Sequence, residues 1–486
     1  MLDRLTLDDW KGETYAPLHR VGHVRARHSA EIASSPIGIG FEKLDRFAFD
    51  PSEVYDWVAQ AGVKWARIQS GWSRTETEAG VYHWEWLDDV VDSLLRRGVQ
   101  PWICLCYGNG LYDELAAKMF GATGYPPIRT DEQRTAWRRY VTALVRRYAG
   151  DGRVRWFEVW NEADGIWSWK TGVNGAEYGE FVKETAAAIR AGAPEAKVIG
   201  GATWCGGYQW LNDVFATGAA SVMDALSFHA YEPDETAQYE RMRALRRLCD
   251  HYHPSLPLIQ GETGTQSRSD GHGALRGCAW TPVRQAKYLS RHLVSHLLHG
   301  VMFTSYFCCL DLIESLGSPS SEHVGYFGVL SGQFNDRNQA VGPYTPKPSF
   351  RTLQTLASVF GTPYRLADRP HYFRRTASAR LNRQQDHVED IVKGCLTHED
   401  GSFGIVYWCP TPVLSTSYDA TTTLELLHAE GQRLMLVDLL DGGVHELPES
   451  CRETLGHGLT LLKELPLRDY PLLLTVGDFV QWERER

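Results

Sequence analysis

The feature that most constrains this chain is a repeated alternation between short apolar runs and longer segments with helical periodicity. Eight apolar runs, each long enough for one strand, are separated by segments whose apolar residues recur at helical spacing. The runs are almost continuously apolar, as is typical of parallel strands that are covered on both faces. The eight runs span residues 36–42, 63–69, 100–107, 154–160, 197–204, 225–231, 256–263 and 301–307.

Eight strand–helix units of this length predict a (β/α)8 TIM barrel, an α/β fold, over residues 36–364. The structural alternative is an open, doubly wound sheet. A dinucleotide-binding sheet of that kind would carry G-x-G-x-x-G after its first strand, and "GIGFEK" does not complete that motif. We therefore favour the barrel.

The helical period fades after about residue 365. Strand-like runs separated by Gly, Asp and Pro turns predict a smaller antiparallel β-sandwich domain over residues 365–486. Residues 1–35 fit neither pattern, and we expect this N-terminal extension to pack on the β-domain. No low-complexity linker separates the parts, so we expect a fixed interface between them.

Composition excludes several classes of partner. The formal net charge is −10 without a basic stripe, so nucleic acid is not expected as a partner. No apolar stretch is long enough to span a membrane, and the first residues lack the pattern of a signal peptide, so we expect a cytoplasmic protein. The ten cysteines form no C-x-x-C pair and lie mostly in apolar runs, which indicates buried thiols. We expect no metal and no cofactor. The sequence leaves the oligomeric state open.

Polar and aromatic residues collect where the predicted strands end. The carboxyl ends of all barrel strands surround one mouth, where TIM-barrel active sites lie. Asn161 and Glu162 end the fourth strand, and Glu262 ends the seventh. The expected substrate-binding residues near the same mouth are Arg67, Trp72, Asn161, Trp167, Trp204, His229, Tyr231 and Tyr306.

Two glutamates on opposing strands can lie about 5–5.5 Å apart, which is the separation used in retaining glycoside hydrolysis. One carboxyl must carry a proton for the leaving oxygen, and the other must be ionised to attack. Arg67 and Tyr231 are placed to keep the pKa of Glu262 low. Asn161 can donate a hydrogen bond to a sugar hydroxyl.

"WNE" at the end of strand four, with "LIQGET" at the end of strand seven, resembles the clan of retaining glycoside hydrolases built on (β/α)8 barrels (clan A). The resemblance implies that Glu162 is the acid/base and Glu262 the nucleophile. It also matches Arg67 to the clan's strand-two arginine. His229 and Tyr231 match its strand-six His-x-Tyr.

Within the clan, the chain is similar to glycoside hydrolase family 39 over about residues 36–365. The segments "YFCCLDL", "GYFGVLS" and "PKPSFRTLQTLASVFG" resemble that family's closing segment. Two positions depart from the pattern, because Phe307 and Thr263 stand where members often have tryptophan. The resemblance implies a β-xylosidase, β-glucosidase or β-galactosidase, and we favour exo action on a glycoside or oligosaccharide.

Three other hypotheses stay open from the sequence. The chain could be an endo-acting β-glycanase on the same fold, or a carbohydrate-binding protein without activity. A metal-dependent barrel hydrolase would need a ligand set at the strand ends, where His229 is the one histidine available. We also expect that some of Trp72, Trp167, Trp169 and Trp204 are loop anchors rather than sugar platforms, and that Cys104 and Cys106 are core residues.

Overall fold

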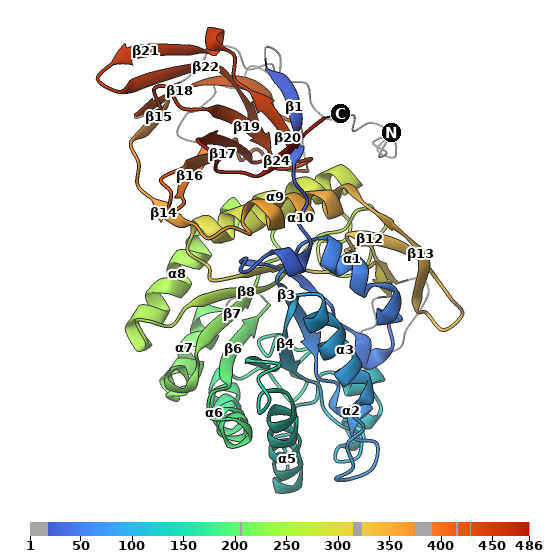
Figure 1. Cartoon of the computed structure of the whole chain (residues 1–486). Coiled ribbons are helices and arrows are strands. Elements are labelled where there is room, and N and C mark those ends of the chain that lie inside the picture. The colour runs from blue at the N-terminus through green and yellow to red at the C-terminus, as the bar shows by residue number, and fades with distance from the viewer. Residues whose placement is uncertain are drawn as a thin grey trace.

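The computed structural model describes residues 18–204, 207–313, 323–374, 391–414, 417–427 and 429–485. Eight parallel strands form a closed barrel in the order of the chain, β2 to β9 (Figure 1). The predicted TIM barrel is therefore confirmed. The barrel strands are β2 Ile37–Gly40, β3 Trp65–Gln69, β4 Gln100–Leu105, β5 Trp156–Val159, β6 Lys197–Thr203, β7 Ala225–His229, β8 Leu258–Thr263 and β9 Thr304–Tyr306.

Helices surround the barrel, and local sequence explains where several of them begin. Thr130 and Thr281 cap α5 and α9 with side-chain hydrogen bonds to the backbone N–H three residues on. Asp50 instead caps a short 3-10 turn, so α1 begins after that turn. The helices are α1 Tyr55–Gln60, α2 Trp72–Thr75, α3 Glu85–Arg96, α4 Glu114–Ala117, α5 Asp131–Tyr148, α6 Gly175–Gly192, α7 Tyr208–Ala216, α8 Thr236–Tyr252, α9 Pro282–Leu298 and α10 Pro348–Val359.

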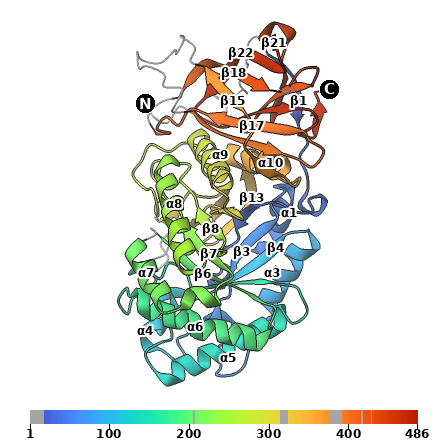
Figure 2. The ribbon, with the colours of Figure 1, turned by 90° about the vertical axis from the view of Figure 1, so that its left-hand side faces the viewer.

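The second part of the molecule contains two antiparallel sheets, which form the expected β-sandwich (Figure 2). The larger sheet has the order β14-β16-β17-β23-β19-β20-β1-β24, and the smaller has the order β15-β18-β22-β21. The strands of the two sheets together are β1 His19–Val24, β14 Arg365–Ala367, β15 His371–Arg374, β16 Val392–Thr397, β17 Phe403–Trp408, β18 Asp419–Leu427, β19 Leu434–Asp438, β20 Gly443–Glu446, β21 Arg452–Gly456, β22 Leu459–Arg468, β23 Leu472–Val476 and β24 Trp482–Arg484.

The first described strand, β1, forms a sheet with strands from the C-terminal part of the chain. β1 pairs antiparallel with β20 and β24, so a segment that precedes the barrel completes the larger sheet of the sandwich (Figure 1). The chain therefore enters the barrel from the sandwich and returns to it. The exact domain limits after residues 35 and 364 stay predictions.

Buried ion pairs connect the barrel to the sandwich through α9. Lys287 Nζ lies 2.9 and 2.8 Å from the two carboxylate oxygens of Asp469, and both side chains are buried. Arg291 pairs with the buried Glu235, whose other oxygen accepts a hydrogen bond from Trp408 Nε1 at 2.8 Å. These contacts require a defined geometry between the two parts, because an unpaired charge would be costly to bury.

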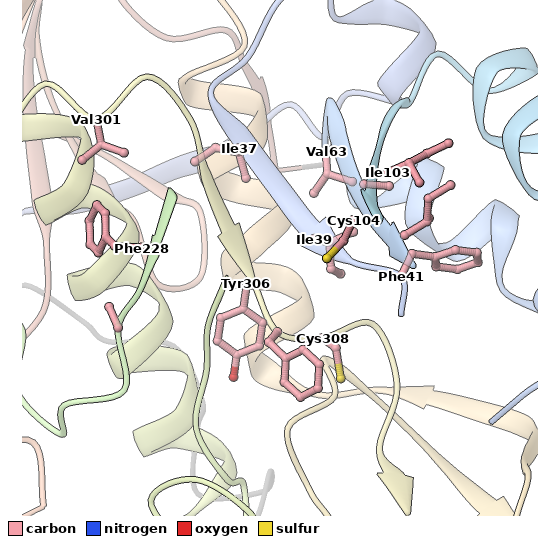
Figure 3. Packing of buried hydrophobic residues seen from close by; sticks show 14 of the residues in the cluster. Ile37, Ile39, Phe41, Val63, Ile103, Cys104, Phe228, Val301, Tyr306 and Cys308 are labelled. Atoms are coloured by element: carbon pink, nitrogen blue, oxygen red, sulfur yellow. The ribbon is translucent and has the colours of Figure 1, made fainter. Parts of the chain in front are cut away.

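Apolar side chains fill the space around the barrel strands. Figure 3 shows Ile37, Ile39, Ile103 and Phe228 in this cluster, and each has almost no exposed surface. Close packing of this kind holds the strand ends in place, and with them the side chains at the mouth. Two small two-stranded antiparallel sheets follow the barrel, formed by β10 Leu312–Ile313 with β11 Val324–Gly325 and by β12 Leu330–Phe334 with β13 Ala340–Pro346. Within the described ranges, no helix is long and apolar enough to cross a membrane.

Candidate active site

The backbone turns sharply where β5 ends. Trp160 and Glu162 have φ angles of 66° and 49°, in the left-handed region that side chains other than glycine rarely adopt. The Trp160 ring is fully buried and its Nε1 donates to Ser168 O at 2.8 Å, while the backbone N–H of Glu162 donates to Ala202 O at 2.9 Å. These contacts hold the strained turn that aims Glu162 at the mouth, as is common at functional sites.

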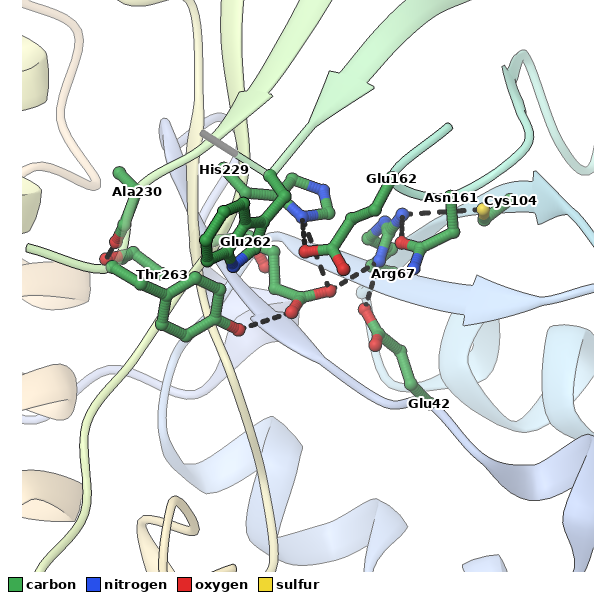
Figure 4. Close-up of polar contacts among 12 residues, drawn as sticks. Glu42, Arg67, Cys104, Asn161, Glu162, His229, Ala230, Glu262 and Thr263 are labelled. Atoms are coloured by element: carbon green, nitrogen blue, oxygen red, sulfur yellow. Dashed lines mark hydrogen bonds and ion pairs between the residues drawn. The ribbon is translucent and has the colours of Figure 1, made fainter. Parts of the chain in front are cut away.

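Glu162 and Glu262 face each other with His229 beside them (Figure 4). One oxygen from each carboxyl and one nitrogen of His229 all lie within 4.8 Å of one another. His229 Nδ1 is 2.9 Å from Glu162 Oε1 and 3.9 Å from Glu262 Oε2. The fold therefore brings together the two glutamates that the sequence placed on strands four and seven.

The guanidinium group of Arg67 binds five surrounding side chains. It is fully buried in the barrel, and each of its three nitrogens donates hydrogen bonds. Four acceptors appear in Figure 4, namely Glu42 Oε1 at 2.9 Å, Glu262 Oε2 at 2.8 Å, Asn161 Oδ1 at 2.8 Å and Cys104 Sγ at 3.4 Å. The fifth acceptor is Glu158 Oε2 at 2.6 Å. The guanidinium offers five N–H donors in a fixed fork, so Arg67 holds this cluster at a set geometry.

The environment of Glu262 corrects one expectation from the sequence. Arg67 and Tyr231 do bind Glu262, because Arg67 Nη1 donates to Oε2 and the Tyr231 hydroxyl donates to Oε1. Burial and the nearby carboxyl of Glu42 nevertheless raise the pKa of Glu262 to about 7, against the opposing effect of His229 and Arg67. The expectation of a low pKa was wrong because burial, together with Glu42, outweighs the lowering effect of Arg67.

The neighbouring groups have pKa values that set the charges of the cluster. Burial lowers the pKa of His229, which makes its ring neutral at ordinary pH. Burial and Glu262 raise the pKa of Tyr231, so its hydroxyl keeps the proton that it donates. Burial would raise the pKa of Glu158, but Arg67 and His229 hold it below its usual value. Burial raises the pKa of Glu42.

Asn161 is oriented by two hydrogen bonds. Its Oδ1 accepts from Arg67 Nη2, and its Nδ2 donates to the Tyr107 hydroxyl at 2.9 Å. An amide nitrogen has two hydrogens, so the second one is available to another acceptor. The side chain is almost buried beside Glu162, which is the position expected for a contact to a sugar hydroxyl.

Two tryptophans line one side of Glu162. Trp167 Nε1 donates to Glu162 Oε2 at 2.7 Å, and the Trp167 ring packs edge-on against Trp204 with 4.8 Å between the ring centroids. Trp204 is 40% exposed. Its backbone N–H donates to Asp164 Oδ1 at 2.8 Å. These rings form an apolar surface next to the Glu162 carboxyl.

Two of the expected substrate contacts lie in the core instead. Trp72 is fully buried, stacks on Tyr112 and Tyr140, and donates from Nε1 to Glu76 Oε2 at 2.5 Å. Tyr306 is also fully buried, and its hydroxyl donates to Thr265 O at 3.3 Å. Their ring faces are covered by protein, so neither offers a surface to a sugar. Tyr306 is the last residue of β9 and Trp72 the first residue of α2, and position along the chain alone does not say in which direction either side chain points.

Two residues of the cluster were missed in the sequence. Glu42 follows the first barrel strand and binds Arg67, and Glu158 lies inside the barrel and also binds Arg67. Reading the end of the first strand as carefully as the others would have found Glu42. A glutamate inside the apolar run "WFEVW" was a signal for Glu158, because an acid in a buried strand needs a partner.

Glu162, His229 and Glu262 are the one group within the described ranges whose atoms are close enough for a metal ion. We do not assign them as metal ligands, because the Arg67 guanidinium already binds Glu262 and a second cation there would be repelled. The nine cysteines in the described part are free thiols. Cys104 and Cys106 are both fully buried, with a sulfur–sulfur distance of 3.7 Å.

Comparison with known proteins identifies the family of the chain. The model of glycosyl hydrolases family 39 matches residues 68–368, which is more than half of the chain. No curated protein matches the sequence. The matched range contains Asn161, Glu162, His229, Tyr231 and Glu262.

Solved structures share the fold along nearly the whole chain. A family 39 glycoside hydrolase from Bacteroides cellulosilyticus WH2 has a TM-score of 0.63 at 18% identity, covering 93% of this chain and 83% of that one. The GH39 enzyme from Xanthomonas axonopodis pv. citri has a TM-score of 0.60 at 17% identity, covering 94% and 96%. A monomeric beta-xylosidase from Caulobacter crescentus CB15 has a TM-score of 0.57 at 18% identity, covering 94% and 98%.

Proposed function

Since the chain belongs to glycosyl hydrolases family 39, we propose that it is a retaining β-glycosidase with Glu262 as nucleophile and Glu162 as acid/base. One observation carries this proposal: an oxygen of each carboxyl lies within 4.8 Å of the other. Retaining enzymes hold their carboxyls about 5–5.5 Å apart, whereas inverting enzymes need about 6.5–9.5 Å to admit a water between them. The short separation supports direct attack by one carboxylate.

In the first step, Glu162 gives its proton to the glycosidic oxygen while Glu262 attacks the anomeric carbon. The C–O bond to the leaving group breaks, and a covalent glycosyl-enzyme forms on Glu262. Arg67 and Tyr231 both donate to Glu262, which orients the attacking oxygen. Asn161 donates its second amide hydrogen to a hydroxyl of the sugar.

In the second step, Glu162 is a carboxylate and takes a proton from water. The water oxygen attacks the anomeric carbon, and the bond to Glu262 breaks. Glu162 is thereby protonated again, and Glu262 returns to its ionised form. Two inversions give a product with the configuration of the substrate.

For the substrate, we propose a β-xyloside cleaved by exo action. Similarity to a beta-xylosidase from Caulobacter crescentus supports this class. The leaving group would lie beside Trp167 and Trp204, since Trp167 is bound to the proton-donating carboxyl. Release of single sugars from the end of xylo-oligosaccharides would support exo action, and a ladder of internal fragments would favour an endo-acting β-glycanase.

A panel of nitrophenyl β-glycosides, with the product anomer followed by NMR, tests the mechanism. We expect the β-anomer to form first. Glu262→Gly should lose turnover, and azide should restore it with formation of the α-glycosyl azide. Glu162→Ala should lose more activity on poor leaving groups than on dinitrophenyl glycosides. Wild-type activity in Glu262→Ala would contradict the assignment, as would an α-anomer formed first by the wild type.

A further inference from the structure

Strand β8 contains a bulge at the point where Glu262 enters the mouth. It has one residue more than β9 between the pairs made by Gln260 and Thr263, and one more than β7 between the pairs made by Gln260 and Glu262. A bulge of this kind interrupts the regular ladder and re-aims a side chain, as is common next to active sites. The end of β8 therefore depends on contacts other than regular strand pairing.

Two hydroxyl groups bind the backbone beside this bulge. The Thr263 hydroxyl donates to the carbonyl oxygen of Ala230 (Figure 4), and the Tyr288 hydroxyl, from α9, donates to the same oxygen at 3.1 Å. The two hydroxyl oxygens are 3.0 Å apart, and either can donate to the other. All three residues are fully buried, where a carbonyl without a donor would cost free energy.

The Ala230 carbonyl belongs to the peptide group that joins Ala230 to Tyr231. That group is planar, so fixing the carbonyl also fixes the direction in which the Tyr231 backbone starts. The N–H of Ala230 donates to the backbone oxygen of Glu262 at 3.0 Å, so both polar backbone groups of Ala230 are bound next to the bulge. From this position the Tyr231 hydroxyl donates to Glu262 Oε1.

We propose that Thr263 and Tyr288 are positioning residues, whose hydroxyls hold the Ala230 carbonyl and thereby keep the Tyr231 hydroxyl on Glu262. Both residues act through Ala230 and Tyr231 rather than on the substrate. The inference rests on the proposed function, because it concerns the nucleophile of that reaction.

The two hydroxyls share this role. They have two hydrogens for three contacts, and every arrangement that uses both hydrogens gives at least one of them to the Ala230 carbonyl. If Thr263 donates to Tyr288, then Tyr288 donates to Ala230, and the reverse order serves equally. Each hydroxyl alone can therefore supply a donor to the carbonyl, so both must be removed to take these donors away.

The hydrogen bond from Tyr231 affects the charge of Glu262 in a known direction. A donor stabilises the ionised carboxyl and so lowers its pKa. The other titratable and charged groups that face Glu262 are Arg67, His229, Glu42 and Glu162. A displaced Tyr231 hydroxyl should therefore raise the pKa of Glu262, and the carboxyl would need a higher pH to ionise.

Thr263→Val combined with Tyr288→Phe tests the inference, because valine and phenylalanine keep the shapes but lack the hydroxyls. We expect the acid limb of the kcat/KM profile to move up by roughly half to one pH unit. At the pH optimum, kcat should fall roughly tenfold while KM changes by less than about threefold, since the attacking carboxyl is affected rather than substrate binding. Each single variant should show a clearly smaller change.

Thr263→Ser combined with Tyr288→Phe is the rescue control. Serine keeps one hydroxyl that can donate to the Ala230 carbonyl, so this variant should have an acid limb close to that of the wild type. A limb shifted as far as in the valine combination would contradict a role for the hydroxyl.

Tyr407→Phe combined with Thr475→Val is the matched control for stability. These residues are buried in the sandwich, and their hydroxyls donate to the backbone carbonyls of Pro466 and Met435. This variant should lose stability without a shift of the acid limb. A shift of the same size would show that any buried hydroxyl has this effect, and would overturn the inference.

An acid limb and a kcat at wild-type values in the folded valine–phenylalanine variant would also overturn it. If that variant does not fold, Thr263→Val alone decides, because it removes the side-chain bond between the ends of β8 and β7. It should move the limb in the same direction by a smaller amount, and an unmoved limb would count equally against the inference.

Failure of the proposed function is distinguishable from failure of this inference. A wild type that hydrolyses no glycoside, or an active Glu262→Ala, would overturn the function. Activity that depends on Glu262, with an acid limb that Thr263 and Tyr288 do not affect, would overturn this inference alone.

Discussion

Arg67 Nη1 donates to Glu262 Oε2 at 2.8 Å while the same nitrogen donates to Glu42 Oε1 at 2.9 Å. One guanidinium nitrogen therefore binds two carboxyls, that of the proposed nucleophile Glu262 and that of Glu42. Arg67→Lys should lower kcat/KM by at least roughly 100-fold, because lysine cannot provide the fork that orients Glu262. It should also lower the free energy of unfolding by about 1–3 kcal/mol, since one ammonium group cannot donate to all of the buried acceptors that Arg67 binds.

Urea unfolding and steady-state kinetics of Arg67→Lys separate these two effects. Arg268→Lys is a matched control, because Arg268 is exposed and pairs with the exposed Asp270. It should change stability by less than about 1 kcal/mol. Wild-type activity in Arg67→Lys would show that Glu262 is oriented by other groups.

The raised pKa of Glu262 predicts the acid limb of the pH profile. This carboxyl must be ionised to attack, and in the folded protein it keeps its proton up to a pKa of about 7. The value of kcat/KM should therefore rise with pH and level off above about pH 7. An acid limb near the ordinary glutamate value of 4.5 would contradict this prediction.

Glu42→Gln should move that acid limb to lower pH. Glu42 is the second cause of the raised pKa of Glu262 after burial, and glutamine keeps its shape without the charge. We expect a shift of roughly one pH unit in the kcat/KM profile. Glu177→Gln, at a glutamate bonded to Trp169 rather than to Arg67, should not move the limb.

Trp167→Phe should weaken the acid step. The variant keeps most of the aromatic surface against Trp204 but removes the Nε1 hydrogen bond to Glu162 Oε2. Loss of one hydrogen bond to the reacting carboxyl should lower kcat/KM on poor leaving groups roughly tenfold. Trp169→Phe is the control, because its fully buried ring bonds Glu177 instead and should alter stability rather than leaving-group dependence.

The barrel and the sandwich should unfold together. Lys287 and Asp469 form a buried pair across their interface, so Lys287→Met should cost about 3–5 kcal/mol by leaving Asp469 unpaired. Replacing both residues, with Lys287→Met and Asp469→Leu, should recover much of that loss. Differential scanning calorimetry should show a single transition in the wild type, and two separate transitions would contradict a fixed interface.

Much of the fold could be predicted because local pattern and tertiary structure agree along the barrel. Each of the eight apolar runs contains one barrel strand, since parallel strands covered on both faces require continuous apolar sequence. Within the sandwich, the segments of β18 and β22 mix threonine and charged residues with leucine, which is the pattern of strands with one exposed face.

The sequence by itself determined that Glu162 and Glu262 share one end of a barrel, because strand ends in this fold have a common side. Only the tertiary structure decided which neighbours they have. It buried Trp72 and Tyr306, brought Glu42 to Arg67, and joined β1 to β20. Such contacts link residues far apart in the chain, and they depend on side-chain direction and burial, which periodicity does not encode. The raised pKa of Glu262 was decided in the same way, by burial and by the neighbouring Glu42.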